Sequence, residues 1–267
     1  MQTRTRDLVL ERLGVEPGRD FAALTTLYEA WCRSIPFDNT LKLIHFSEQS
    51  SGRLPGSSAE EFFESWLELG TGGTCWAGNG ALYELLADLG FAAERAIATM
   101  QPAPDTQRPN HGSVIVTIDG ERWIVDASIL SGKPVRIEPP GFQAEGPLPR
   151  FEWIDAKPVV RWRMLMAPEG FPCRIDRIGA SSEEWDALHQ RTAAWSPFNY
   201  VLSTRQLRND ESIGAAGGQL FRFTADGDLS SSPLEGSART SFLIDTLGIP
   251  ESLALRVPPD QPIPPRP

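Results

Sequence analysis

The stretch Gly70-Thr-Gly-Gly-Thr-Cys75-Trp-Ala-Gly-Asn-Gly80 places a cysteine between glycines on both sides. Leucines follow it at helical spacing until Gly90, so we expect Cys75 on a tight turn at the start of a helix. Free backbone N–H groups and the positive end of the helix dipole favour a thiolate there. A buried structural cysteine is the alternative, because free cysteines are among the most buried residues. The leucines are Leu82, Leu85, Leu86 and Leu89.

The composition is typical of a globular protein that binds neither nucleic acid nor membrane. Its 267 residues are 40% hydrophobic and 22% charged, which fits one or two domains. The net charge of −10 argues against a nucleic-acid backbone as the main partner. No apolar run approaches the roughly 20 residues of a spanning helix, and residues 1–7 do not resemble a signal peptide. Three cysteines in a chain of this length do not form a disulfide framework. This indicates a reducing compartment, so we expect a cytoplasmic protein.

No metal site is predicted. The sequence contains neither Cys-x-x-Cys nor His-x-x-x-His, and its three histidines are His45, His111 and His189. No pattern gives His45 or His189 an acidic or cysteine partner. We interpret the two other cysteines, Cys32 and Cys173, as packing residues.

The periodicity changes from helical to strand-like after Gly90, and the Pro-rich segment 258–267 is expected to be extended or disordered. We expect helices over 6–14, 20–33, 59–69, the segment after Cys75, 182–194 and 242–248. We expect strands over 91–99, 111–118, 121–126, 135–137, 151–154, 159–164, 198–202 and 220–224.

A hairpin signal allows His111 and Asp126 to be placed relative to each other. Asp119-Gly120 favours a two-residue turn, which pairs Ile118 with Glu121 and puts His111 and Asp126 on one face of the ribbon. A carboxylate that holds an imidazole beside a helix-start cysteine is the arrangement that nucleophilic catalysis needs.

Each of these three residues also has a simpler interpretation. His111 could be a polar residue at a strand start, Asp126 could cap a turn, and Cys75 could be a packing residue. A slip of one residue in the hairpin would also move Asp126 to the other face. The three residue types together satisfy one mechanism, and we therefore predict a Cys75–His111–Asp126 catalytic triad.

Several motifs resemble the arylamine N-acetyltransferase family. Ile35-Pro-Phe-Asp-Asn39 is similar to the family's Ile-Pro-Phe-Glu-Asn. Thr71-Gly-Gly-Thr-Cys-Trp-Ala-Gly-Asn79 is similar to its Arg-Gly-Gly-aromatic-Cys-aromatic-Glu-Leu-Asn. His111 and Val125-Asp126 fit the family's spacing of histidine and aspartate, and the resemblance continues through Ser196-Pro-Phe-Asn to Ile249, over about residues 6–250.

The resemblance implies an α+β fold with a cysteine-protease-like core. A helical domain (1–90) carries the nucleophile, a β-barrel-like domain (91–195) carries His111 and Asp126, and an α/β lid (196–257) precedes the tail. It implies ping-pong chemistry, in which the cysteine takes an acyl group from a thioester, normally acetyl-CoA, and passes it to a small-molecule amine. No tightly bound cofactor is implied. The predicted substrate-binding residues are Phe37, Trp76, Gly112 and Phe198.

The chain also departs from the family pattern near the predicted triad. Thr71, Thr74 and Ala77 replace an arginine, an aromatic residue and a glutamate, and residues 127–130 replace a glycine-containing segment. These departures predict slow acylation by acetyl-CoA and faster acylation by a longer acyl-CoA or by the phosphopantetheine of an acyl carrier protein. A basic patch would then dock the carrier, with Arg161, Arg163, Arg174, Arg177, Arg205 and Arg208 as candidates.

A transglutaminase-like amidase or thioesterase with the same triad is the alternative function. A papain-type protease is disfavoured, because papain histidines lie about 130–150 residues after the cysteine. Whether water or an amine accepts the acyl group depends on how the fold excludes water, and the alternatives stay open at the level of sequence.

Overall fold

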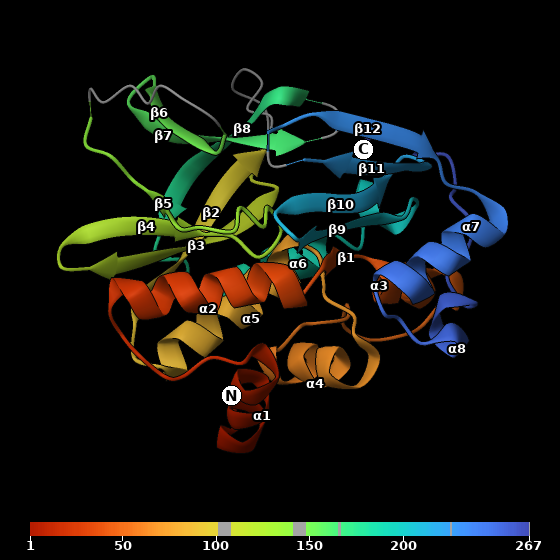
Figure 1. Ribbon diagram of the computed structural model, residues 1–267, viewed down its shortest axis with the longest axis horizontal. Coiled ribbons are helices and arrows are strands. Elements are labelled where there is room, and N and C mark those ends of the chain that lie inside the picture. Colours follow the sequence, from red (N-terminus) through yellow and green to blue (C-terminus); the bar gives the residue numbers. More distant parts are fainter. Residues whose placement is uncertain (101–107, 141–147, 165–166, 225, 267) are drawn as a thin grey trace.

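The computed structural model describes residues 1–100, 108–140, 148–164, 167–224 and 226–266. Its N-terminal part is helical, as the sequence predicts (Figure 1). Asp20 begins α2 by accepting a hydrogen bond from the Ala23 N–H at 2.8 Å, and Ser58 caps α4 in the same way. The sequence analysis does not predict α3. The helices are α1 (Thr3–Leu13), α2 (Phe21–Ser34), α3 (Thr40–Ser47), α4 (Ala59–Leu69) and α5 (Cys75–Asp88).

A strongly bent seven-stranded antiparallel sheet follows, with the order β5-β4-β3-β2-β8-β7-β6. Its two edge strands, β5 and β6, also contact each other, so the sheet is nearly closed into a barrel. The sequence analysis does not predict the long strand β8. The strands are β2 (Ala92–Met100), β3 (His111–Ile118), β4 (Glu121–Val125), β5 (Val135–Arg136), β6 (Arg150–Ile154), β7 (Lys157–Met164) and β8 (Ala167–Ile178).

The hairpin β3–β4 has the register that its turn predicts. Ile118 pairs with Glu121, and both turn residues have positive φ, 51° at Asp119 and 81° at Gly120. Both faces of this hairpin are buried, because it lies between two cores. Val114, Val116 and Val125 pack on the helices, whereas Ile115 and Ile124 point into the barrel.

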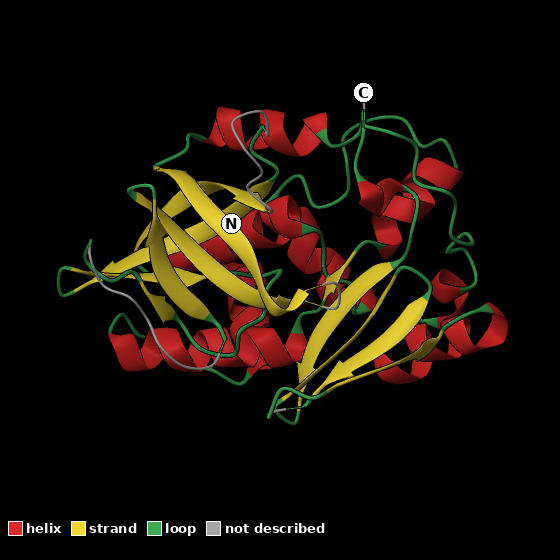
Figure 2. Ribbon diagram, turned by 90° about the horizontal axis from the view of Figure 1, so that it is seen from above, coloured by secondary structure: helices red, strands yellow, loops and turns green. Residues whose placement is uncertain are grey.

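A second sheet of five strands, in the order β1-β9-β10-β11-β12, lies beside the first (Figure 2). Its edge strand β1 comes from the N-terminal segment, since Phe37 pairs with Arg205. The predicted domain boundaries at 90 and 195 stay a prediction. The strands are β1 (Phe37–Asp38), β9 (Ser203–Arg208), β10 (Glu211–Ala216), β11 (Gln219–Phe223) and β12 (Leu229–Pro233).

The connections around this sheet correct two predictions. The strand expected over 198–202 is wrong, because Ser196 accepts a hydrogen bond from the Phe198 N–H and starts a 3-10 turn, η1 (Pro197–Asn199). The helix expected over 242–248 is a π-helical turn, η2 (Phe242–Thr246), that continues α7 (Gly236–Ser241). The remaining helices are α6 (Ser182–Arg191) and α8 (Glu251–Ala254).

The tail after residue 257 makes specific contacts with the rest of the chain. Residues 258–266 belong to no helix or strand. The Gln261 N–H donates to the Tyr200 carbonyl at 2.8 Å, and the Trp195 indole donates to the Pro264 carbonyl at 3.0 Å. A Pro-rich segment can be held in this way because its carbonyl groups still accept hydrogen bonds, and the predicted boundary of the tail stays a prediction.

Candidate active site

Cys75 is the first residue of α5, at the end of a loop whose backbone packs closely against β1. A Cβ on Gly72 would lie 1.7 Å from the Pro36 carbonyl oxygen, so only glycine fits there. The Gly72 N–H donates to the Asp38 carboxylate, and the Asp38 N–H donates to the Gly73 carbonyl at 3.3 Å. This packing presents the thiol at a helix N-terminus with 5% of the residue exposed.

Asp38 and Asn39 link the cysteine loop to the second sheet. From the sequence, both are expected to be turn residues. Asn39 instead donates to the carbonyls of Phe198 and Val201, both at 2.8 Å, and accepts from the Ser203 N–H at 2.8 Å. The motif at 35–39 therefore connects the nucleophile loop with the wall of the neighbouring cleft.

His111 and Asp126 meet on the face of the hairpin that the register predicts. The His111 Nε2 lies 2.7 Å from the Asp126 Oδ2, and both residues are buried. The other carboxylate oxygen, Oδ1, accepts from the Ser128 hydroxyl at 2.6 Å, the Ser128 N–H at 2.9 Å and the Ile129 N–H at 3.1 Å. Asp126 is thus fixed by its own turn and holds the imidazole with its remaining oxygen.

The charges of this pair support each other. Burial acts to lower the pKa of His111, but the Asp126 carboxylate and the hydrogen bonds to Asp126 and Cys75 raise that pKa well above its usual value. Burial acts to raise the pKa of Asp126, but the His111 charge and the hydrogen bonds from His111 and Ser128 hold it well below its usual range. Both directions have one cause, because the Asp126 carboxylate stabilises a proton on the His111 imidazole.

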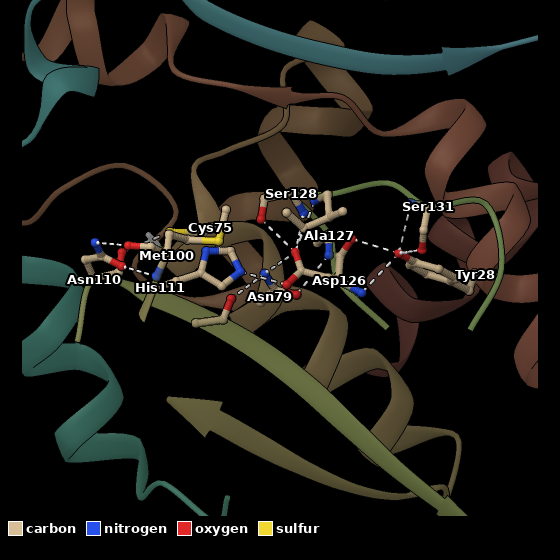
Figure 3. Close-up of polar contacts among 12 residues, drawn as sticks. Tyr28, Cys75, Asn79, Met100, Asn110, His111, Asp126, Ala127, Ser128 and Ser131 are labelled. Carbon is tan, nitrogen blue, oxygen red and sulfur yellow. Dashed lines mark hydrogen bonds and ion pairs between the residues drawn. The ribbon is translucent and has the colours of Figure 1, made fainter. Parts of the chain in front are cut away.

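The thiol of Cys75 lies next to the imidazole (Figure 3). Since Nε2 is bonded to Asp126, Nδ1 is the ring nitrogen left for the sulfur. The sulfur also lies 3.9 Å from the Asn110 carbonyl oxygen. A charged imidazole and a helix N-terminus beside one thiol both favour its thiolate form.

Asn79 and Tyr28 join the elements that carry the three predicted catalytic residues. Asn79 donates to the Gly112 carbonyl at 2.7 Å and to Asp126 at 3.2 Å, and it accepts from the Ala127 N–H at 2.8 Å. The Tyr28 hydroxyl donates to the Asp126 carbonyl at 2.9 Å. Neither role is predicted from the sequence. The position of Asn79 one helical turn after Cys75 could have indicated that both side chains share a helix face, whereas no sequence pattern points to Tyr28.

A cleft of about 920 Å³ opens onto Cys75 and His111. Three of the predicted substrate-binding residues, Phe37, Trp76 and Phe198, line it. The rings of Phe37 and Phe198 form an edge-to-face pair at 5.3 Å. Trp76 is only 2% exposed and packs edge-to-face on Trp185 at 4.9 Å, so most of its surface serves the core.

Gly112, the fourth predicted substrate-binding residue, lies away from the cleft. A Cβ there would lie 2.4 Å from the Trp185 ring and 2.8 Å from the Trp76 ring. Its carbonyl is held by Asn79. Gly112 therefore allows β3 to lie close to two tryptophans, and its predicted contact with substrate stays a prediction.

Among the described residues, no group of three or more His, Cys, Asp or Glu side chains is arranged to hold a metal ion. His189 is buried beside Lys42 and Arg53, and burial and these charges lower its pKa to about 3. None of the helices in the described ranges is both long and apolar enough to cross a membrane.

Selective reactivity of Cys75 is a direct expectation from these environments. Burial raises the pKa of both Cys32 and Cys173 to about 12, whereas Cys75 lines the cleft beside His111. Sub-stoichiometric iodoacetamide followed by peptide mapping should therefore label Cys75 first. Faster labelling of Cys32 or Cys173 would contradict this assignment of the nucleophile.

Comparison with known proteins gives the family. The sequence profile described as N-acetyltransferase matches residues 20–153, half of the chain. An arylamine N-acetyltransferase of Mycolicibacterium smegmatis is 30% identical over 140 residues, which are 48% of this chain and 49% of that protein. The chain belongs to the arylamine N-acetyltransferase family. It spans about half the length of this curated relative.

The arylamine N-acetyltransferase fold extends over nearly the whole chain. The Mycobacterium marinum enzyme is 20% identical, with a TM-score of 0.77 over 94% of this chain and 98% of that one. The same enzyme in complex with CoA gives the same TM-score. The Salmonella typhimurium enzyme is 17% identical, with a TM-score of 0.77 over 96% of this chain and 98% of that one. The predicted α+β fold class and family resemblance are therefore confirmed.

Proposed function

We propose that this arylamine N-acetyltransferase family member is an N-acyltransferase. It would take an acyl group from acyl-CoA, hold it as a thioester on Cys75 and pass it to a small-molecule arylamine. The observation that carries the proposal is the Cys75–His111–Asp126 arrangement at the wall of the cleft. The Mycobacterium marinum relative solved in complex with CoA supports CoA as the donor. The aromatic pair of Phe37 and Phe198 supports an aromatic acceptor.

The proposed reaction has two half-reactions. His111 takes the thiol proton, the Cys75 thiolate attacks the thioester carbonyl, and His111 returns the proton to the leaving CoA thiolate. An amine then attacks the acyl-Cys75 carbonyl, and His111 takes a proton from the amine and gives it to the departing Cys75 sulfur. Free backbone N–H groups in the first turn of α5, including that of Trp76, are the proposed oxyanion donors in both steps.

Transfer can be separated from hydrolysis by following the acyl-enzyme. Protein acylated by acyl-CoA is freed of donor by rapid gel filtration and mixed with buffer or with an arylamine. We expect the arylamine to remove the acyl group much faster than water does and to yield one N-acyl product per acyl-enzyme. Loss of the acyl group at the same rate in buffer would instead favour the amidase or thioesterase alternative.

The identity of the acyl group stays a prediction from the sequence departures. Ser128 and Ile129, which replace the family's glycine-containing segment, line the cleft. We expect acetyl-CoA to acylate Cys75 more slowly than a longer acyl-CoA does, measured as acyl-Cys75 formed against time. An acyl carrier thioester and acyl-pantetheine of the same chain length serve as further donors. If acetyl-CoA is the fastest donor, this prediction is wrong, and the chain has the acetyl specificity that is ordinary for its family.

A further inference from the structure

The cleft carries positive charge in a protein that is negative as a whole. The chain has 35 acidic and 25 basic side chains. Yet the described residues that line the cleft include four arginines and neither an aspartate nor a glutamate. The arginines are Arg108, Arg191, Arg205 and Arg266. A wall of this composition attracts an anionic ligand more strongly than a neutral one.

Three of these arginines meet at the mouth of the cleft, from segments far apart in sequence. Arg108 precedes β3, Arg191 ends α6 and Arg266 belongs to the tail, and all three are exposed. Arg191 donates to the Pro109 carbonyl at 2.6 Å. Arg266 lies over the Trp195 ring at 5.6 Å, and Trp195 itself donates to Pro264. Arg191 and Arg266 are therefore held in place by contacts other than ion pairs.

The cluster brings like charges together. Burial and the charges of Arg108 and Arg266 lower the pKa of Arg191. Within the described ranges, no ion pair links any of these three arginines to a carboxylate. Bringing like charges together costs free energy, which an anionic ligand would offset.

Three of the six arginines expected from the sequence to form a basic patch are neutralised by carboxylates. Arg161, Arg174 and Arg177 each form an ion pair with a nearby carboxylate. Arg205 lines the cleft, but it bonds the Ser212 hydroxyl and the Arg163 carbonyl, both at 2.8 Å. The carboxylate partners are Glu152, Asp176 and Glu184. None of the three arginines at the mouth belongs to that predicted set.

We propose that Arg108, Arg191 and Arg266 form a polyanion site that binds the diphosphate and 3′-phosphate of the donor's CoA nucleotide. This inference rests on the proposed acyl-CoA chemistry and deepens it. Guanidinium groups match phosphate in pairs of parallel hydrogen bonds, and three of them can serve the separate phosphates of CoA. A carrier-bound pantetheine has one phosphodiester and no adenosine 3′-phosphate, so the site favours free CoA thioesters over a carrier protein.

Calorimetric titration with CoA, dephospho-CoA and pantetheine tests the site without requiring turnover. The variants are Arg108→Gln, Arg191→Gln and Arg266→Gln, with Arg222→Gln as the matched control. Arg222 is an exposed arginine in β11 that pairs with Glu211 outside the cleft. Each cluster variant should weaken CoA binding by about tenfold, as loss of a charged hydrogen bond predicts. The affinity for pantetheine should not change in any variant. The Arg222→Gln control should bind CoA as tightly as the wild type does. Added salt should weaken CoA binding by the wild type more than CoA binding by the three cluster variants.

Two results would overturn the site. One is unchanged CoA binding in all three cluster variants. The other is an equal loss for CoA and pantetheine, which indicates a general change of the cleft. Failure of the proposed function gives a different result, since CoA would then bind with the expected dependence on the arginines while no CoA thioester acylates Cys75.

Discussion

Replacing Asp126 with asparagine is expected to lower the rate of acyl transfer by about 10⁴-fold, the loss seen when the orienting aspartate of a triad is changed in this way. The amide is nearly the same size and can keep hydrogen bonds to the turn at Ser128. It cannot supply the negative charge that holds the His111 imidazolium. With that charge removed, burial dominates and the pKa of His111 should fall.

The measurements for this variant are the rate of acyl-Cys75 formation and the His111 pKa from NMR titration. Asp119→Asn is the matched control, because Asp119 lies in the turn of the same hairpin and asparagine tolerates its positive φ. We expect near-wild-type acylation from the control. A folded Asp126→Asn protein with a near-wild-type rate would show that the carboxylate does not orient the imidazole.

Cys75→Ala is expected to abolish acyl-enzyme formation and to reduce amide formation by about 10⁶-fold, as removal of a nucleophile does in enzymes that use a covalent intermediate. Alanine fits the first turn of α5, so the loss should not come from unfolding. Product formation from an acyl-CoA and an arylamine measures the rate, and circular dichroism checks the fold. Cys173→Ala, at a buried cysteine in β8, serves as the control and should still be acylated at Cys75.

Amide formation by Cys75→Ala at more than a small fraction of the wild-type rate would point to direct transfer without a covalent intermediate. Both substrates would then have to occupy the cleft at once. The triad geometry would in that case serve another step, and the proposed ping-pong sequence would be wrong.

The central part of the site could be predicted from sequence because its parts are placed by local rules. The glycines before Cys75 and the leucines after it indicate a turn and a helix. Asp119-Gly120 fixes a two-residue turn, and this turn sets which residues share a face over the whole hairpin. His111 and Asp126 follow from that register. The type of this one turn is therefore enough to predict that His111 and Asp126 are in contact.

The rest of the site depends on contacts between distant segments, which no local pattern specifies. Tyr28 reaches Asp126 from α2, and Asn39 reaches the loop before β9. The arginines at the cleft mouth come together only when α6 and the tail pack beside the loop before β3. The family resemblance predicts that Gly112 contacts the substrate, but it does not indicate that two tryptophans fill the space next to this glycine.

The most direct test of the central claim is intact-protein mass spectrometry with peptide mapping, after brief mixing of the wild-type protein with an acyl-CoA. The account predicts one acyl group per chain, on the peptide that contains Cys75, and its disappearance as an added arylamine becomes the N-acyl product. An acyl group on Cys32, on Cys173 or on another residue would contradict the account. So would N-acyl product formed while Cys75 stays unmodified throughout.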